Sequence, residues 1–276
     1  MRWIHQELPI GCTCWPLEQL VGMCPPESEF AAAPDCPALA EQLARLAIEG
    51  DEPACAELLE RILRSGIGMV EVYQDILGGT MRHVGEWYHL GAIDVAGEHA
   101  ASSIVERLMY RASQIFGHGI PTNRTALLGG GPETWHVIGL RMLADVLRNQ
   151  GWRVIFLGPN MPVPAFLKAV ETRKPDLVLL SCHAVRSLDG TLEMIRALGS
   201  YRRTLPSGKT FLIGVGGGFV RNHPEYFRDA GADFQSEDLR SFATRTLPEI
   251  DRILGEGGHW VQDTFTRPRP SASPAF

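Results

Sequence analysis

Residues 133–139 read Glu-Thr-Trp-His-Val-Ile-Gly and lie between a strand pattern and a helix pattern. An apolar run at 125–129 precedes them, and apolar residues at helical spacing occupy 137–149. This order predicts the first strand-to-helix loop of an alternating α/β domain, with His136 at the carboxyl edge of the sheet, where such domains bind ligands. A histidine there can present a neutral imidazole to a metal, and Gly139 leaves room beside it for a bulky group.

The same alternation continues along the second half of the chain. Strand patterns lie at 125–129, 153–157, 177–181, 211–215 and 232–235, and helical patterns lie at 137–149, 163–173, 188–203, 223–230 and 238–254. Apolar strands that alternate with helices predict a doubly wound parallel sheet. Residues 125–254 are therefore expected to form a Rossmann-like, flavodoxin-like domain.

The first half has helical periodicity instead. Apolar residues recur at helical spacing within about 35–49, 51–64, 69–90 and 95–115. Helices joined by short connections fit a small bundle, which we expect at 35–116. Residues 117–124 are predicted to be a linker, 1–34 a poorly ordered extension and 255–276 a disordered tail.

Composition excludes several classes of protein. The 276 residues are 45% hydrophobic and carry a formal net charge of -6, which argues against nonspecific nucleic-acid binding. No apolar run is long enough to cross a membrane, and the first residues lack a signal-peptide pattern, so we expect a cytoplasmic protein without a membrane partner. The six cysteines are expected to be thiols, and the spacing of Cys12, Cys14 and Cys24 matches no common zinc pattern.

Three loops of the predicted sheet should meet at one edge, because the carboxyl ends of parallel strands lie together. The residues that these loops offer are His136 and Gly139, then Ser181 and His183, then Gly216, Gly217 and Gly218. Residues 140–180, which are 41 positions, separate the first pair from Ser181.

This arrangement resembles the cobalamin-binding domain of the methionine synthase type. That family has Asp-x-His-x-x-Gly, a spacer, Ser-x-Leu or Ser-x-Thr, and then a Gly-Gly pair; His136, Gly139, Ser181 and the glycines at 216–218 match. The resemblance implies that His136 ligates cobalt from below in place of the corrinoid's own nucleotide base. It also implies that the glycines let the displaced nucleotide tail approach the backbone, and that Ser181 can form a hydrogen bond near the base.

Two positions depart from the family pattern. Thr134 replaces the aspartate, and His183 replaces the Leu or Thr. A carboxylate in that place normally fixes the imidazole tautomer and raises its basicity, whereas Thr134 supplies only a hydroxyl, with Glu133 as a possible substitute. We expect ligation to survive and proton-coupled methyl transfer to be impaired. His183 either approaches the cofactor or caps a helix.

The helical half resembles the cap over the upper face of cobalamin in CarH-type light-dependent repressors, whose pattern is Trp-His-x-Gly followed by Glu-His-x-x-Ser. Alignment on Glu98-His99 places the capping tryptophan on Tyr88, with Trp87 beside it, and the cobalt ligand of the light-exposed state on His89. The upper-face residues implied are Trp87, Tyr88, His89, Val95, Glu98 and His99. Each also has an ordinary interpretation: a helix end at His89, a favourable helix dipole at Glu98, and bundle core at Trp87 and Tyr88.

The chain also resembles the AerR/PpaA antirepressors of photosynthetic bacteria, which pair such a cap and cobalamin domain without a DNA-binding domain. In that family the ligand histidine follows a tryptophan, as in Trp135-His136, and residues 1–34 are too short and not basic enough for a winged helix. The resemblance implies a protein that is not an enzyme, binds a CrtJ/PpsR-type repressor of photosynthesis genes, and switches by axial ligand exchange at cobalt. His89 is the expected incoming ligand, with His99 as the second choice.

Two other functions use the same pair of domains. One is a corrinoid protein that carries methyl groups for a methyltransferase system, and the other is a haem-binding sensor. A nicotinamide enzyme is disfavoured, because the run Leu128-Gly-Gly-Gly lacks the third glycine of the dinucleotide fingerprint.

Overall fold

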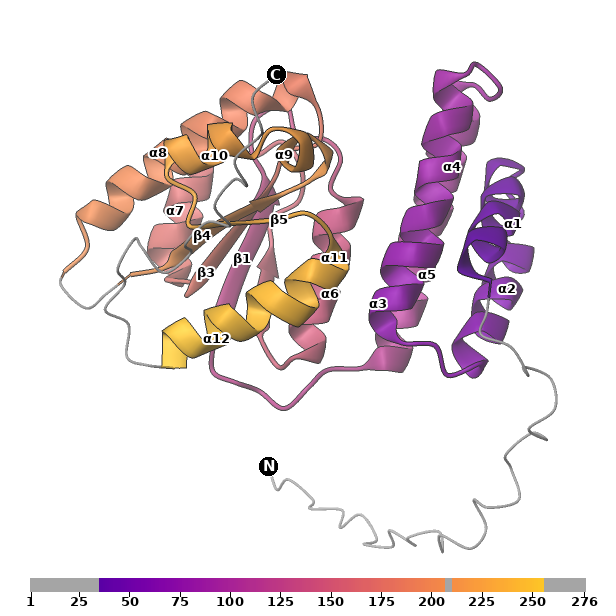
Figure 1. The fold of residues 1–276 in the computed structure, drawn as a ribbon, viewed down its shortest axis with the longest axis horizontal. Helices are drawn as coiled ribbons and strands as arrows, with labels where there is room; N and C mark the ends of the chain where they lie inside the picture. Colours follow the sequence, from indigo (N-terminus) through magenta and orange to yellow (C-terminus); the bar gives the residue numbers. More distant parts are fainter. Residues whose placement is uncertain (1–34, 207–209, 256–276) are drawn as a thin grey trace, which may run out of the picture. The chain divides into compact units, whose positions relative to one another are not determined.

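The computed structural model describes residues 35–206 and 210–255 (Figure 1). The predicted N-terminal extension, with Cys12, Cys14 and Cys24, and the predicted tail beyond Gly255 lie outside the described residues. Within the described part, no helix combines the length and the apolar character needed to cross a bilayer.

The first half is helical, as expected. Its helices are α1 (Cys36–Ile48), α2 (Glu52–Arg64), α3 (Met69–Glu71), α4 (Gly78–His89) and α5 (Val95–Phe116). Carboxylates of Asp35, Asp51 and Asp94 accept hydrogen bonds from the first-turn N–H groups of α1, α2 and α5 at 3.1, 3.0 and 2.9 Å, which fixes where these helices begin.

A π-helical segment, Val72–Leu77, joins α3 to α4 without a break in helical backbone angles. The periodicity predicted one helix over 69–90, and the path of the chain agrees. The π-helical bonding was not predicted, because a local change in hydrogen-bond spacing leaves the apolar pattern almost unaltered.

The second half confirms the doubly wound parallel sheet. Five parallel strands lie in the order β2-β1-β3-β4-β5. They are β1 (Thr125–Gly130), β2 (Arg153–Phe156), β3 (Leu177–Ser181), β4 (Leu212–Gly216) and β5 (Phe234–Ser236). The prediction placed β5 about two residues too early, because the apolar pattern weakens in this short edge strand.

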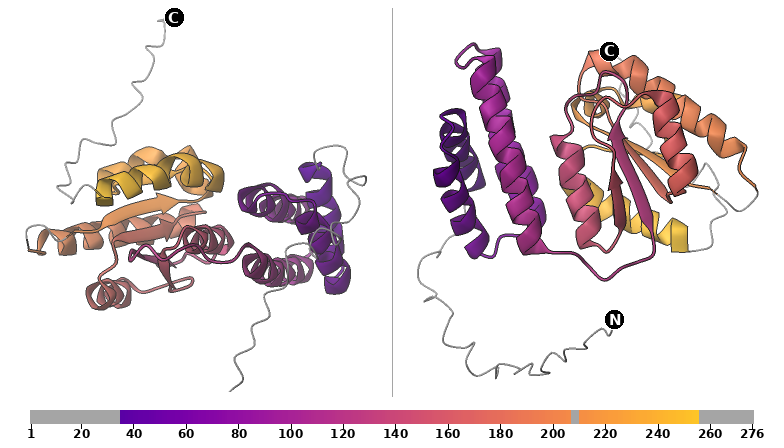
Figure 2. Two further views of the ribbon diagram at one scale, coloured as in Figure 1. Left: turned by 90° about the horizontal axis from the view of Figure 1, so that it is seen from below. Right: turned by 180° about the vertical axis from the view of Figure 1, so that it is seen from behind.

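Helices cover both faces of the sheet (Figures 1 and 2). They are α6 (Ile138–Asn149), α7 (Val163–Arg173), α8 (Leu188–Arg203), α9 (Gly218–Asn222), α10 (Pro224–Ala230), α11 (Leu239–Ser241) and α12 (Leu247–Gly255). One apolar core unites the sheet with α7, α8 and α10, and a second unites its other face with α6 and α12. Burial on both faces explains why the strands are almost continuously apolar.

The bundle and the sheet domain share buried contacts. Met142 and Val146 of α6 belong to the same apolar cluster as the bundle core. The hydroxyl of Tyr73, which is fully buried, donates to Asp145 Oδ2 of α6 at 3.1 Å, and Arg148 donates to the other oxygen of that carboxylate at 2.6 Å. A buried hydrogen bond to a charged acceptor is among the stronger polar contacts in a protein.

Replacing Tyr73 with phenylalanine removes this bond and leaves one carboxylate oxygen of Asp145 buried without the Tyr73 partner. We expect a loss of roughly 1–3 kcal/mol in the free energy of unfolding, measured by urea denaturation. Tyr110→Phe is the control, because that ring is 67% exposed. Equal stabilities of the two variants would contradict the importance of the Tyr73–Asp145 contact.

Candidate cofactor site

The three predicted loops leave the sheet at one level. The last paired residues of the central strands are Gly130, Ser181 and Gly216, which stand side by side across β1, β3 and β4. The loops that follow these residues therefore begin together at the carboxyl edge, as the sequence predicted.

Main-chain and hydroxyl contacts join the first two loops. Thr134, which is almost fully buried, donates from its hydroxyl to the Ser181 carbonyl at 3.4 Å, and the Ser181 hydroxyl donates to the His136 carbonyl at 3.4 Å. The Thr134 hydroxyl thus has a main-chain acceptor rather than the His136 ring. Glu133 is exposed with φ of 60°, and its N–H donates to Asn160 Oδ1 at 3.0 Å.

His136 and His183 lie ring against ring. Their ring centroids are 4.9 Å apart and their planes are inclined by 32°. His183 therefore lies at the same edge of the sheet as His136, and its predicted approach to the cofactor stays a prediction.

Both histidines favour the neutral form. Desolvation by the surrounding protein is the main cause that lowers the pKa of His136, Arg186 lowers it further, and Glu98 opposes the shift. Desolvation likewise lowers the pKa of His183, with smaller contributions from His136 and Arg221. A neutral imidazole is the form that can donate an electron pair to a metal.

Arg186 and Arg221 were not singled out from the sequence. The first lies in a short 3-10 turn after β3, and the second lies in α9 after β4. Their position just beyond two of the three converging loops was the signal that could have identified them.

The glycines of the site have different roles. Gly217 has φ of +121°, and a Cβ on it would lie 2.4 Å from the Cys182 carbonyl oxygen. A Cβ on Gly218 would lie 3.1 Å from the His183 ring. Gly139 is the reverse case, because a Cβ on it would meet no atom within 4 Å. Gly217 is therefore required by the fold, whereas the space around the Cβ position of Gly139, three residues after His136, is open.

The predicted upper-face residues lie at the end of α4 and the start of α5. Tyr88 and His89 are exposed, with ring centroids 6.1 Å apart, and Val95 is also exposed. Trp87 instead packs against the bundle core, with His83 stacked at 5.9 Å and Arg45 at 5.2 Å from its ring centroid. Trp87 is thus partly buried against the bundle core, while Tyr88 and His89 are exposed, and the upper-face role of all three stays a prediction.

Glu98 links this end of the bundle to the histidine edge. Its carboxylate accepts a hydrogen bond from Ser102 at 2.8 Å and contacts His99 Nδ1 at 2.5 Å. The same carboxylate lies close enough to His136 to raise the pKa of that ring against the other contributions. Residues from both halves therefore act on one histidine.

The side chains of this site suit a metal ion that is already bound in a macrocycle. Among the described residues, no group of three or more His, Cys, Asp or Glu could hold a bare metal ion. A bare ion takes most of its ligands from side chains, whereas a macrocyclic metal needs one or two axial ones. The exposed neutral His136, with open space at Gly139, meets that need.

Comparisons with known proteins agree with this geometry. Residues 125–240 match a family described as B12 binding domain, and residues 39–112 match a second family with the same description. Each half of the described chain thus matches a B12 binding domain, and cobalamin is the cofactor.

Similar proteins include regulators and corrinoid proteins. The HTH-type transcriptional repressor CarH of Myxococcus xanthus is 30% identical over 173 residues, which cover 63% of this chain and 55% of CarH. CarA of the same organism is 29% identical over 70% of this chain and 62% of its own length. Trimethylamine corrinoid protein 2 of Methanosarcina mazei is 28% identical over 48% of this chain and 62% of its own length. The chain therefore spans 55–62% of the length of these curated relatives.

The fold also matches a solved structure. The monomethylamine corrinoid protein of Methanosarcina barkeri superposes with a TM-score of 0.64 and 16% identity, over 77% of this chain and 98% of that protein. At this identity the likeness concerns the fold alone.

The lowered pKa of His136 has a consequence for stability. Because the pKa is below the ordinary value near 6.5, the unfolded chain binds the proton more readily. The free energy of unfolding is therefore unaffected by this shift above about pH 6.5. It decreases as the pH falls from there through the lowered pKa of His136. Proton NMR of the cofactor-free protein, with His136→Ala for assignment, should give a midpoint below 6.5. A midpoint at or above the ordinary value would contradict the desolvation of this ring.

The two glycine environments predict opposite effects of alanine. Gly217→Ala should lower the free energy of unfolding by roughly 2 kcal/mol or more, because its Cβ meets a backbone carbonyl at a positive φ. Gly139→Ala, within the first turn of α6, should leave stability unchanged or raise it by up to about 1 kcal/mol. Thermal unfolding of the two variants measures the difference, and equal losses would overturn this assignment.

Proposed function

We propose that this chain, a cobalamin-binding protein related to the CarH and CarA repressors, is a light-responsive regulator of transcription that acts by binding another protein. The specific role proposed is that of an AerR/PpaA-type antirepressor, with a CrtJ/PpsR-type repressor of photosynthesis genes as the partner. The observation that carries the proposal is the neutral histidine at the open sheet edge, within electrostatic reach of Glu98 from the bundle.

Cobalamin supplies a cobalt ion with two axial positions, the upper of which can carry an organic group that light removes. His136 is the proposed lower ligand, because its ring is kept neutral and no atom lies within 4 Å of the Cβ position of Gly139, three residues further on. His183 supports the face of the His136 ring, and the Thr134–Ser181 contact holds the loop that presents it. The nucleotide tail is proposed to pass along the backbone of Gly216, Gly217 and Gly218, although Cys182 and His183 take the space that a Cβ on Gly217 or Gly218 would fill.

His89 is the proposed upper ligand of the light-adapted state, with His99 as the second choice. His89 is the last residue of α4, and the neighbouring Leu90 is 81% exposed. Binding of His89 would shift the helix end at residues 88–91, together with its exposed apolar side chains, and so change the surface offered to the partner. Ligand exchange of this kind requires no catalysis by the protein.

The second candidate is a corrinoid protein that carries methyl groups for a methyltransferase. The resemblance to trimethylamine corrinoid proteins favours it. Thr134 argues against it, since its hydroxyl supplies no carboxylate and donates to a main-chain carbonyl. A haem-binding sensor would also use a single imidazole, and the experiment below separates it from the other two.

Visible absorption spectra with adenosyl-, methyl- and hydroxocobalamin, in the dark and after illumination, test the proposal. We expect bound corrinoid bands that change irreversibly with light in the parent protein and weaken strongly in His136→Ala. His118→Ala is the control, because that exposed histidine lies in the linker. Binding without any photochemical change would favour the methyl carrier, and a Soret band with haem but no corrinoid bands would favour the haem sensor.

The upper ligand has its own test. His89→Ala should bind the cofactor normally in the dark but fail to form the light-adapted spectrum, because it lacks the incoming imidazole. Normal photoconversion in His89→Ala together with its loss in His99→Ala would transfer the role to His99. Normal photoconversion in both variants would contradict ligand exchange by the bundle.

A further inference from the structure

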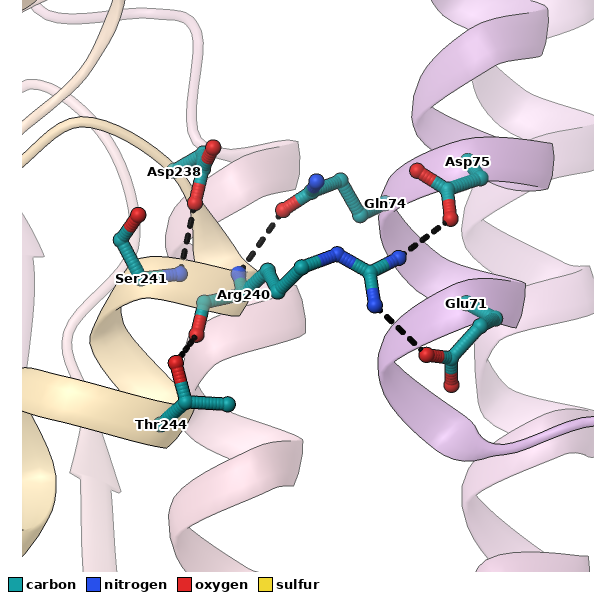
Figure 3. Close-up of polar contacts among 7 residues, drawn as sticks. All are labelled: Glu71, Gln74, Asp75, Asp238, Arg240, Ser241 and Thr244. Carbon is teal, nitrogen blue, oxygen red and sulfur yellow. Dashed lines mark hydrogen bonds and ion pairs between the residues drawn. The ribbon is translucent and has the colours of Figure 1, made fainter.

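Arg240 of α11 connects the sheet domain to the start of the continuous helix formed by α3, the π-helical segment and α4 at residues 69–89, called the long helix below (Figure 3). Its guanidinium donates through Nη1 to Glu71 Oε1 at 2.7 Å and through Nη2 to Asp75 Oδ2 at 2.6 Å. Its backbone N–H donates to Gln74 Oε1 at 2.8 Å. One residue thus binds three polar side chains within residues 71–75 of the other half.

The local structure around Arg240 holds it in place. The Asp238 carboxylate accepts the N–H of Ser241 at 2.7 Å and caps α11, and the Thr244 hydroxyl donates to the Arg240 carbonyl at 2.8 Å. Both carboxylates that face Arg240 come from one face of the helix, four residues apart. The planar fork of an arginine suits two such acceptors, because each terminal nitrogen can serve one of them.

Two kinds of contact hold the halves together here. The Arg240 ion pairs are partly exposed, with side-chain exposures of 43% for Arg240, 38% for Glu71 and 32% for Asp75. Such pairs contribute little each and are screened by salt. The Tyr73–Asp145 bond and the packing of Met142 and Val146 are buried and depend much less on salt. The buried contacts therefore keep the halves attached, and the ion pairs form the part that solution conditions can adjust.

The helices that meet at this place share an unusual feature. The bundle helix has its π-helical segment at Val72–Leu77, and a second π-helical segment, Phe242–Thr246, follows α11 directly. π-Helical segments are rare in proteins as a whole. Those that do occur often lie at functional sites. The hydrogen bond from Arg240 is also the main cause that lowers the pKa of Glu71.

The long helix runs from the Arg240 contact to the predicted upper-face residues, so a change of its angle at one end moves the other end. From Glu71 to His89 there are 18 residue steps, or about 27 Å at the helical rise of about 1.5 Å per residue. A rotation of about ten degrees at the base would therefore move the far end by roughly 5 Å. That displacement is larger than a hydrogen bond, so the angle at the base decides whether the far end reaches the histidine edge.

We infer that Arg240 is a positioning residue, whose two ion pairs set the angle of the long helix and so hold residues 88–99 over the His136 edge. The inference deepens the proposed function, because its meaning for the cofactor rests on that site. It also predicts that high salt loosens this hold, since the ion pairs are partly exposed.

The angle can be measured without any cofactor. Spin labels at Leu90→Cys and Val185→Cys, both highly exposed positions, report the distance between the end of the bundle and the second loop. Serine replaces Cys12, Cys14, Cys24 and Cys36, while Cys55 and Cys182 are buried and stay. The distance distribution is recorded for the parent, Arg240→Met, Arg240→Lys and Arg107→Met in about 0.01 M and about 1 M salt, where the Debye length is about 30 Å and about 3 Å. Arg107→Met is the matched control, because Arg107 forms a partly exposed ion pair with Glu52 inside the bundle.

We expect Arg240→Met to broaden the distribution at both salt concentrations, and high salt to broaden it in the parent and in Arg107→Met. Arg240→Lys, which keeps the charge without the fork, should lie between the parent and Arg240→Met. Circular dichroism melting shows that each variant is folded. Identical distributions for the parent and Arg240→Met at low salt would overturn the inference.

A second measurement extends the test to the cofactor. The rate at which added imidazole replaces the upper ligand of bound hydroxocobalamin should rise about fivefold in Arg240→Met, because this change removes two ion pairs that each contribute little free energy. The rate should stay unchanged in Arg107→Met. An unchanged rate in Arg240→Met would contradict the link to the cofactor. If the parent binds no corrinoid, the proposed function fails, and the distance measurement still decides whether Arg240 positions the helix.

Discussion

The arrangement of the site depends on one main-chain contact between parallel strands. The N–H of Cys182 donates to the Gly216 carbonyl at 2.8 Å, one step beyond the last pair of β3 and β4. This bond brings the second loop against the third so closely that only glycine fits at position 217. The same loop then places His183 on the ring of His136.

The charge state of His136 results from opposing influences of both halves of the chain. Desolvation and Arg186 disfavour the protonated ring, whereas Glu98 from the start of α5 favours it. Any movement of the bundle changes the distance from Glu98 to His136, so the position of the bundle affects the basicity of this ring. Arg240 contacts the bundle at residues 71–75, at the opposite end of the long helix from His89. A change in the angle of that helix at Arg240 would therefore also change the distance from Glu98 to His136.

Much of the fold followed from the sequence, because burial leaves a clear periodic pattern. The strand predicted at 177–181 coincides with β3, which is buried along its whole length. Convergence of the three loops followed from parallel topology alone. The stacking of His183 on His136 did not, since it depends on the turn made by the 217–218 glycines. The Arg240 contacts were also missed: they join residues 165 to 169 positions apart, and charged residues on helices have the same pattern when they face solvent.

In the proposed site a histidine of this chain, and not the cofactor's own base, ligates cobalt. Electron paramagnetic resonance of the protein with cob(II)alamin tests it directly, because the axial nitrogen splits the cobalt lines. In protein labelled with nitrogen-15 histidine, ligation by His136 predicts that each line changes from the triplet of nitrogen-14 to a doublet, and that His136→Ala abolishes the change. A triplet that persists in the labelled protein would show that the cofactor's own base is the ligand and would exclude ligation by His136.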